Sequence, residues 1–249
     1  MITVDWETYV QLLALVQNSI IAAAVLGILG GLIGVFVMQR DMAFAVHGIS
    51  ELSFAGAAAA LLLGLNVVAG SLYPGRSGNK FGLLTGQIIS VDIPQLGLLI
   101  TISVLVLLVL IVVWRPLTFD SLDPEVAHAR GVPGRPLSFI FMVLLGLAVA
   151  VSVQVIGALL VLALLVTPAA AALRVSSSPV LVPVLSMVFG FVSAVGGILL
   201  AIGGSLPISP YITTISFAIY VVCRIVGSRR LSATSRRLSA PSRRTLEAT

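Results

Sequence analysis

His47 and Glu51 are the two residues of this sequence whose types and spacing best suit the binding of a metal ion. They lie four positions apart, so on a helix they share one face, with Cβ atoms about 5–6 Å apart. An imidazole and a carboxylate are good ligands for Zn²⁺ and acceptable ones for Mn²⁺ or Fe²⁺. One such pair supplies only two ligands. A metal site here therefore implies a second copy of the chain, which brings its own pair to a shared axis.

Both residues stand in an otherwise apolar stretch that is long enough to enter a lipid bilayer. A charged side chain at mid-bilayer costs about 2.5–3.5 kcal/mol even on insertion scales. Glu51 should therefore favour a water-filled path or a cation. Two interpretations stay open: the pair lines an ion pathway, or it forms a hydrogen bond that joins helices.

The elements that position this pair must be membrane helices. Of the 249 residues, 59% are hydrophobic and only 9% are charged, and the mean hydropathy is +1.17. A soluble domain carries roughly a quarter charged residues, so this chain has too few to cover a water-facing surface. The apolar stretches are continuous and rich in Gly and Ala, whereas barrel strands would alternate. The sequence predicts an all-α, polytopic membrane helix bundle with about seven segments: Tyr9–Met38, Met42–Gly70, Leu96–Trp114, Leu137–Gln154, Ile156–Leu173, Val180–Ile202 and Ile208–Val226.

The distribution of basic residues predicts how these segments are oriented. With the N-terminus outside, the loops and tail on the inner side hold twelve of the 14 basic residues, and Arg76 and Lys80 are the two exceptions. This is a strong positive-inside bias. We therefore expect a multi-pass plasma-membrane protein with a transmembrane domain over residues 1–228 and a basic, disordered cytoplasmic tail over residues 229–249. The Arg residues of this tail suit anionic lipid and do not indicate nucleic-acid binding.

The longest inner loop contains a short helix with clear start and stop signals. Asp123 can cap the free N–H groups of a helix start, Pro124 suits the first helical position, and Glu125 favours the positive helix end. Gly131 and Pro133 then end the helix.

A two-turn helix is not stable without packing against something. We therefore expect a docking helix, whose Val126 and Ala129 form a small apolar face for a partner, flanked by Arg130. The simpler alternative is a capped connector between two spans.

Four stretches in the same order resemble the permeases of the zinc/manganese/iron class of bacterial ABC uptake transporters: residues 30–44, 61–64, 119–133 and 154–174. The resemblance covers roughly residues 16–227. It implies a fold similar to the cobalamin-type ABC importer permeases, a dimer of permeases, a cytoplasmic dimer of ATP-binding cassette subunits and an extracytoplasmic metal-binding protein. ATP hydrolysis would belong to the separate cassette subunits, so this chain would be a transport subunit and not an enzyme.

The resemblance also implies roles for particular residues. The segment 123–132 would be the coupling helix that enters a groove on the ATPase. The pore-lining pair of the family, an Asp followed four residues later by a His, corresponds to His47 and Glu51. The two ligand types are kept but their order is reversed. The transported divalent metal ion would be the cargo, and no covalently bound cofactor is expected.

The sequence departs from the family between Gly64 and Phe81, where other members have one more transmembrane hairpin. Losing an in-and-out pair preserves the orientation of every later segment. Three alternatives stay open: a siderophore- or cobalamin-type ABC permease, a seven-span receptor, and a truncated membrane protein that does not transport.

Overall fold

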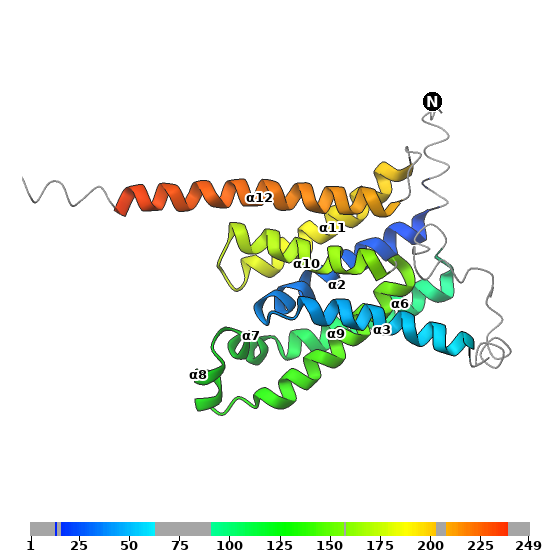
Figure 1. The fold of residues 1–249 in the computed structure, drawn as a ribbon, viewed down its shortest axis with the longest axis horizontal. Helices are drawn as coiled ribbons and strands as arrows, with labels where there is room; N and C mark the ends of the chain where they lie inside the picture. The colour runs from blue at the N-terminus through cyan, green and yellow to red at the C-terminus, as the bar shows by residue number, and fades with distance from the viewer. Residues whose placement is uncertain (1–12, 14–15, 63–90, 157, 203–207, 239–249) are drawn as a thin grey trace, which may run out of the picture.

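The computed structural model describes residues 13, 16–62, 91–156, 158–202 and 208–238 (Figure 1). Within these ranges the chain forms α-helices and no β-strand, which confirms the all-α prediction. Helices suit this composition because each backbone N–H and C=O finds its partner within the same segment, as lipid requires. The helices are α2 (Gln17–Gln39), α3 (Ala43–Leu62), α6 (Ile93–Val112), α7 (Trp114–Leu122), α8 (Pro124–Ala129), α9 (Gly134–Ile156), α10 (Ala158–Val175), α11 (Leu181–Ile202) and α12 (Ile208–Leu238).

Every predicted span overlaps one helix, but the number of membrane crossings stays a prediction. Five of the described helices are long and apolar enough to cross a membrane: α2, α6, α9, α11 and α12. The apolar part of α10, Leu160–Val175, is shorter. The short helix α7 was not expected, because its sequence mixes Trp, Arg, Pro and Asp without an apolar period. The region of the expected missing hairpin, between Gly64 and Phe81, lies outside the described residues.

Helix α12 differs from the expected boundary between membrane domain and tail. It continues to Leu238, so the first ten residues of the basic tail extend the last helix. No Gly or Pro stands between Gly227 and Pro241, and Arg, Leu and Ala are good helix formers. Residues 229–238 of the expected tail are thus helical, and residues 239–249 lie outside the described chain. The division into a membrane domain and a cytoplasmic tail stays a prediction.

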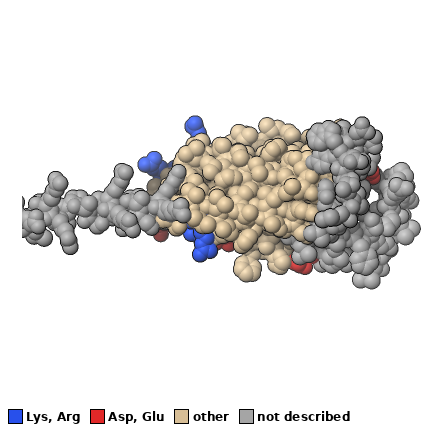
Figure 2. Space-filling view, turned by 90° about the horizontal axis from the view of Figure 1, so that it is seen from above, with Lys and Arg blue, Asp and Glu red and all other residues tan. Residues whose placement is uncertain are grey.

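The long helices run back and forth along one axis, and the turn after α2, the helices α7 and α8, and the turn after α10 meet at the same end (Figure 1). We call this the α8 end. Figure 2 shows Lys and Arg side chains at this end and a broad uncharged band beside it. Among the described residues, basic side chains therefore gather at the α8 end, and the orientation in the membrane stays a prediction.

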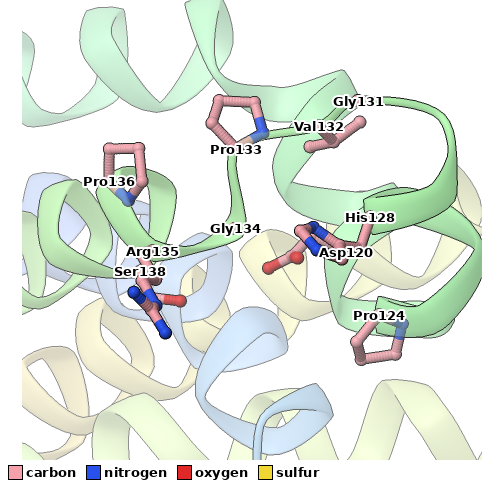
Figure 3. A pocket seen from close by; sticks show the side chains of 10 residues that line it. All are labelled: Asp120, Pro124, His128, Gly131, Val132, Pro133, Gly134, Arg135, Pro136 and Ser138. Carbon is pink, nitrogen blue, oxygen red and sulfur yellow. The ribbon is translucent and has the colours of Figure 1, made fainter.

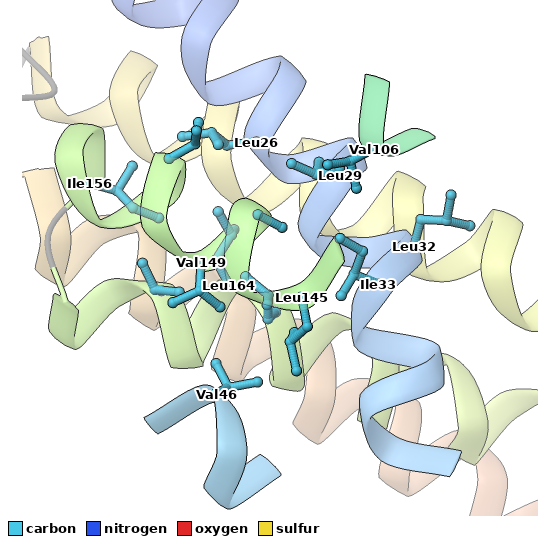
Figure 4. Close-up of a cluster of buried hydrophobic side chains, with 14 of the residues drawn as sticks. Leu26, Leu29, Leu32, Ile33, Val46, Val106, Leu145, Val149, Ile156 and Leu164 are labelled. Atoms are coloured by element: carbon cyan, nitrogen blue, oxygen red, sulfur yellow. The ribbon is translucent and has the colours of Figure 1, made fainter. Parts of the chain in front are cut away.

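Helix α2 forms the centre of the bundle. It packs against α11, α10 and α6, while α3 packs mainly on α9 and α10 (Figure 1). Leu26, Leu29 and Ile33 of α2 are almost fully buried and share one apolar cluster with Leu145 of α9 and Leu164 of α10 (Figure 4). Val46 brings the inner face of α3 into the same cluster. The core thus fixes which face of α3 points outward.

Helices α2 and α11 approach each other closely because small residues meet at their crossing. A Cβ atom on Gly27 would lie 2.6 Å from the carbonyl oxygen of Gly190, and one on Gly31 would overlap the carbonyl oxygen of Ser186. The Ser186 hydroxyl donates a hydrogen bond of 2.6 Å to the carbonyl oxygen of Gly31. Small residues and interhelical hydrogen bonds are the usual means of helix association in lipid, where burial of apolar surface drives little.

The turn from α2 into α3 is a helix-ending motif with two backbone bonds. The Met42 N–H donates to the carbonyl of Val37, and the Asp41 N–H donates to that of Met38. Asp41 adopts the left-handed conformation, with φ 53°, that this Schellman motif requires. Helix α3 starts two residues later, so its direction is set by the end of α2.

We expect Gly31→Ala to destabilise the protein, because the added methyl group has no room at the α2–α11 crossing. Overpacking of this kind costs about 1–3 kcal/mol. Thermal unfolding of the detergent-purified protein should show a lower Tm. Gly146→Ala on α9 is the matched control, since a Cβ there would meet nothing within 4 Å. Equal Tm values for both variants would contradict the close packing described here.

Candidate functional site

Helix α3 has a buried face and an exposed face, and the predicted ligand pair lies on the exposed one. Val46 and Ser50 are buried against the bundle. Phe44, with 89% of its surface exposed, and Leu52 lie on the outward face together with His47 and Glu51. The outward face therefore consists of two polar side chains between apolar ones.

The structure brings the two predicted ligands together. The Nε2 atom of His47 lies 3.9 Å from the Oε1 atom of Glu51, and 52% and 59% of the two side-chain surfaces are exposed. This distance is too long for a direct hydrogen bond. Two ligand atoms on one tetrahedral Zn²⁺, each bonded at about 2.0–2.1 Å, lie roughly 3.4 Å apart. A small rotation of either side chain would let both atoms contact one ion.

This chain alone does not complete a metal site within the described residues. No three side chains of the types His, Cys, Asp and Glu gather there closely enough to hold an ion. A second such pair from another chain would raise the ligand number from two to four. The interpretation of the pair as a bond between two helices has no support in this geometry, because both residues belong to α3 and are half exposed.

Helix α8 has the start and the end that the sequence predicts. The Asp123 side chain accepts a hydrogen bond of 3.1 Å from the Val126 N–H, Pro124 stands at the first helical position, and Glu125 lies in the first turn. At the other end, Gly131 adopts φ +79°. The Val132 N–H then donates to the carbonyl of Ala127, which completes a second Schellman motif.

The predicted apolar face of α8 points away from the bundle. Val126 and Ala129 are exposed, and so is Arg130. Ala127, which the sequence did not single out, is fully buried and anchors the helix. An open groove adjoins α8 (Figure 3), lined by Asp120, Pro124, His128, Gly131, Val132, Pro133, Gly134, Arg135, Pro136 and Ser138.

Sequence reasoning missed the polar cluster that holds this region in place. Arg40, which counted only as one of the inner basic residues, forms an ion pair of 2.6 Å with Asp120 of α7. The two side chains are only 12% and 13% exposed. Removing one partner of such a buried pair typically costs about 3–5 kcal/mol. The sequence shows an Arg at the end of one apolar span and an Asp in a later loop. It does not indicate that they pair, because 80 positions separate them.

Comparisons with known proteins agree with this architecture. A chain of the solved structure "PsaBC from Streptococcus pneumoniae in complex with Fab" superposes with a TM-score of 0.76, over 87% of this chain and 94% of that one, at 23% identity. At this identity the likeness shows a shared fold.

Curated relatives include the manganese import system permease protein ScaB of Streptococcus pneumoniae, which is 25% identical over 86% of this chain and 91% of its own length. The manganese transport system membrane protein MntC of Halalkalibacterium halodurans is 26% identical over 73% of this chain and 77% of its own. The high-affinity zinc uptake system membrane protein ZnuB of Buchnera aphidicola is 27% identical over 76% and 69%.

The ABC 3 transport family matches in two pieces, over residues 13–78 and 74–227. The two pieces meet within residues 64–81, where the resemblance to the family implies that a transmembrane hairpin is missing. Together they include the outward face of α3, the α8 segment and the α2–α11 crossing. On the strength of this match over most of its length, the chain belongs to the ABC 3 transport family.

Proposed function

We propose that this protein is the membrane-spanning permease subunit of an ATP-driven importer of divalent metal ions. The observation that carries the proposal is the imidazole–carboxylate pair on the outward face of α3, 3.9 Å apart and half exposed. An ionisable pair in an apolar helix is costly against lipid and marks an ion pathway by default. Membership of the ABC 3 transport family, with manganese and zinc permeases among the relatives, agrees with this cargo.

The ligand chemistry limits the cargo to a group of ions. One nitrogen and one carboxylate from each chain suit Zn²⁺, Mn²⁺ or Fe²⁺ and disfavour large organic cargo such as a siderophore. Two copies of the chain, related by an axis that passes the exposed face of α3, would supply two nitrogens and at least two oxygens. The apolar neighbours Phe44 and Leu52 would then pack against the second copy instead of lipid.

The α8 end is the side on which an ATPase would bind. The positive-inside rule directs the basic α8 end toward the cytoplasm, which leaves the N-terminus outside. There the exposed Val126 and Ala129 offer a small apolar contact to a cytoplasmic dimer of ATP-binding cassette subunits. A metal-binding protein would deliver the ion from outside. ATP binding would move α8, and the path past His47 and Glu51 would open to alternate sides of the membrane.

We expect His47→Ala and Glu51→Gln each to abolish metal uptake while the protein still assembles, because alanine removes the imidazole ligand and glutamine removes the negative charge and one carboxylate oxygen. Uptake of radioactive Mn²⁺ or Zn²⁺ by cells that express the complete transporter measures this effect. Leu52→Ile, on the same face of α3 but without a ligand atom, should retain uptake. Normal uptake in both ligand variants would remove the proposed role, and no uptake by the unmodified transporter would favour a non-transporting membrane protein.

We expect the double variant Glu125→Lys with Val126→Asp to lose binding of the ATPase. It reverses the charge of Glu125 and replaces the apolar Val126 by a charged residue on the exposed face of α8. Co-purification of the cassette subunit with the detergent-solubilised permease measures the loss. Asp92→Lys, a charge reversal at the start of α6, should bind the cassette subunit normally. Unchanged co-purification and unchanged stimulation of ATP hydrolysis in the double variant would show that α8 is a connector and not a docking helix.

A further inference from the structure

Arg40 is the point at which three elements of the α8 end are tied together. Its Nη2 atom donates to Oδ2 of Asp120 at 2.6 Å, its Nε to the hydroxyl of Ser121 at 2.8 Å, and its Nη1 to the hydroxyl of Ser138 at 3.0 Å. Each nitrogen of the guanidinium group thus has a different partner. Lys cannot replace this arrangement, since it carries one nitrogen on a flexible chain and lacks the planar fork.

The three partners of Arg40 stand on both sides of α8 in the chain. Asp120 and Ser121 belong to the last turn of α7, just before α8, and Ser138 belongs to the first turns of α9, just after it. Helix α8 itself packs on α7 and α9. One side chain at the end of α2 therefore holds both ends of the segment that we propose as the ATPase contact.

The guanidinium group is also fixed from the side. It lies 5.5 Å from the ring centre of Phe141, within the range of a cation–π contact. Phe141 and Phe36 are almost fully buried and lie 6.0 Å apart between ring centres, and Phe36 meets Trp114 edge to face at 5.1 Å. This aromatic layer leaves Arg40 little freedom to change its position relative to α7 and α9.

A short and rigid connection leads from Arg40 to the ligand pair. Arg40 directly precedes Asp41, and the Schellman motif there joins the end of α2 to the start of α3 at Ala43. His47 follows one turn into α3. A displacement of α7, α8 and α9 that moves Arg40 must therefore also turn or shift the first turns of α3.

We propose that Arg40 is a positioning residue that transmits the movement of α8 to His47 and Glu51. This inference rests on the proposed function as a permease driven by an ATPase. Arg40 does not contact the transported ion; it sets where the ligand pair stands while α8 moves. Its loss should therefore separate ATP hydrolysis from transport and leave ATPase binding intact.

The test is the ratio of ions transported to ATP hydrolysed, measured with the complete transporter in proteoliposomes. In Arg40→Lys, which keeps the charge beside Asp120 but not the three-way hydrogen bonding, we expect this ratio to fall at least tenfold. Co-purification of the cassette subunit should be unchanged. The matched control is Arg115→Lys, an exposed arginine in the first turn of α7, which should keep the ratio of the unmodified transporter.

A second variant disturbs the same cluster without changing Arg40. A Cβ atom on Gly134 would lie 2.9 Å from Oδ1 of Asp120, and Gly134 does not adopt a left-handed φ, so the backbone accepts alanine. Gly134→Ala should displace the carboxylate from Arg40 by a few tenths of an ångström and lower the ratio about threefold. This variant keeps the inference testable if Arg40→Lys fails to fold.

The outcomes separate this inference from the function on which it rests. If the unmodified transporter carries metal and both variants lose uptake and ATP hydrolysis in proportion, so that the ratio is unchanged, Arg40 is a structural anchor and the inference is overturned. If the unmodified transporter carries no metal ion, the proposed function fails first, and the role of Arg40 in coupling fails with it.

Discussion

Lipid offers no hydrogen-bond partners, and this constraint limits which polar groups the membrane helices can carry and where these groups can lie. Within the described residues, most of the bundle meets it in an ordinary way: helices bond internally, Ser186 bonds to the backbone of α2, and glycines allow α2 and α11 to come close. The buried hydroxyls of Ser103 and Ser216 have no partner there. The outward face of α3 differs because two ionisable side chains, His47 and Glu51, are half exposed on it. Such a face is stable in a membrane only where water, an ion or another protein covers it. The permease dimer that we propose, with a metal path along its axis, would meet that need.

The same constraint explains why the buried polar cluster lies at the α8 end. Polar contacts are concentrated there, at the edge of the apolar band, where a buried Arg40–Asp120 pair can form without crossing the bilayer centre. The pair joins α2 to α7, and Ser138 adds α9. The two helix-ending motifs at Asp41 and Gly131 then fix how α3 and α8 leave this cluster. The proposed coupling needs such a link, and Arg40 stands between the cluster that holds α8 and the turn that leads to His47.

Local signals predicted the local features of this structure well. The capped helix at Asp123 and its end at Gly131 follow from backbone chemistry within ten residues, and the shared face of His47 and Glu51 on α3 follows from a spacing of four. Long-range contacts were not predictable in the same way. The Arg40–Asp120 pair spans 80 positions, and the burial of Ala127 depends on how α8 lies against its neighbours. The continuation of α12 to Leu238 was not predicted, because a basic composition is typical of a disordered tail even where Gly and Pro are absent.

Whether a second copy covers the outward face of α3 is the central question, and cysteine cross-linking in native membranes tests it most directly. Gly48 is exposed between His47 and Glu51, and a side chain added there meets nothing within 4 Å. In a background in which the native Cys223 is replaced by alanine, Gly48→Cys should form a disulfide-linked dimer under mild oxidation. Leu105→Cys, on the exposed surface of α6, should not. If instead Gly48→Cys stays monomeric and reacts with a lipid-soluble maleimide as fast as Leu105→Cys, the face is turned to lipid and the proposed metal path does not exist.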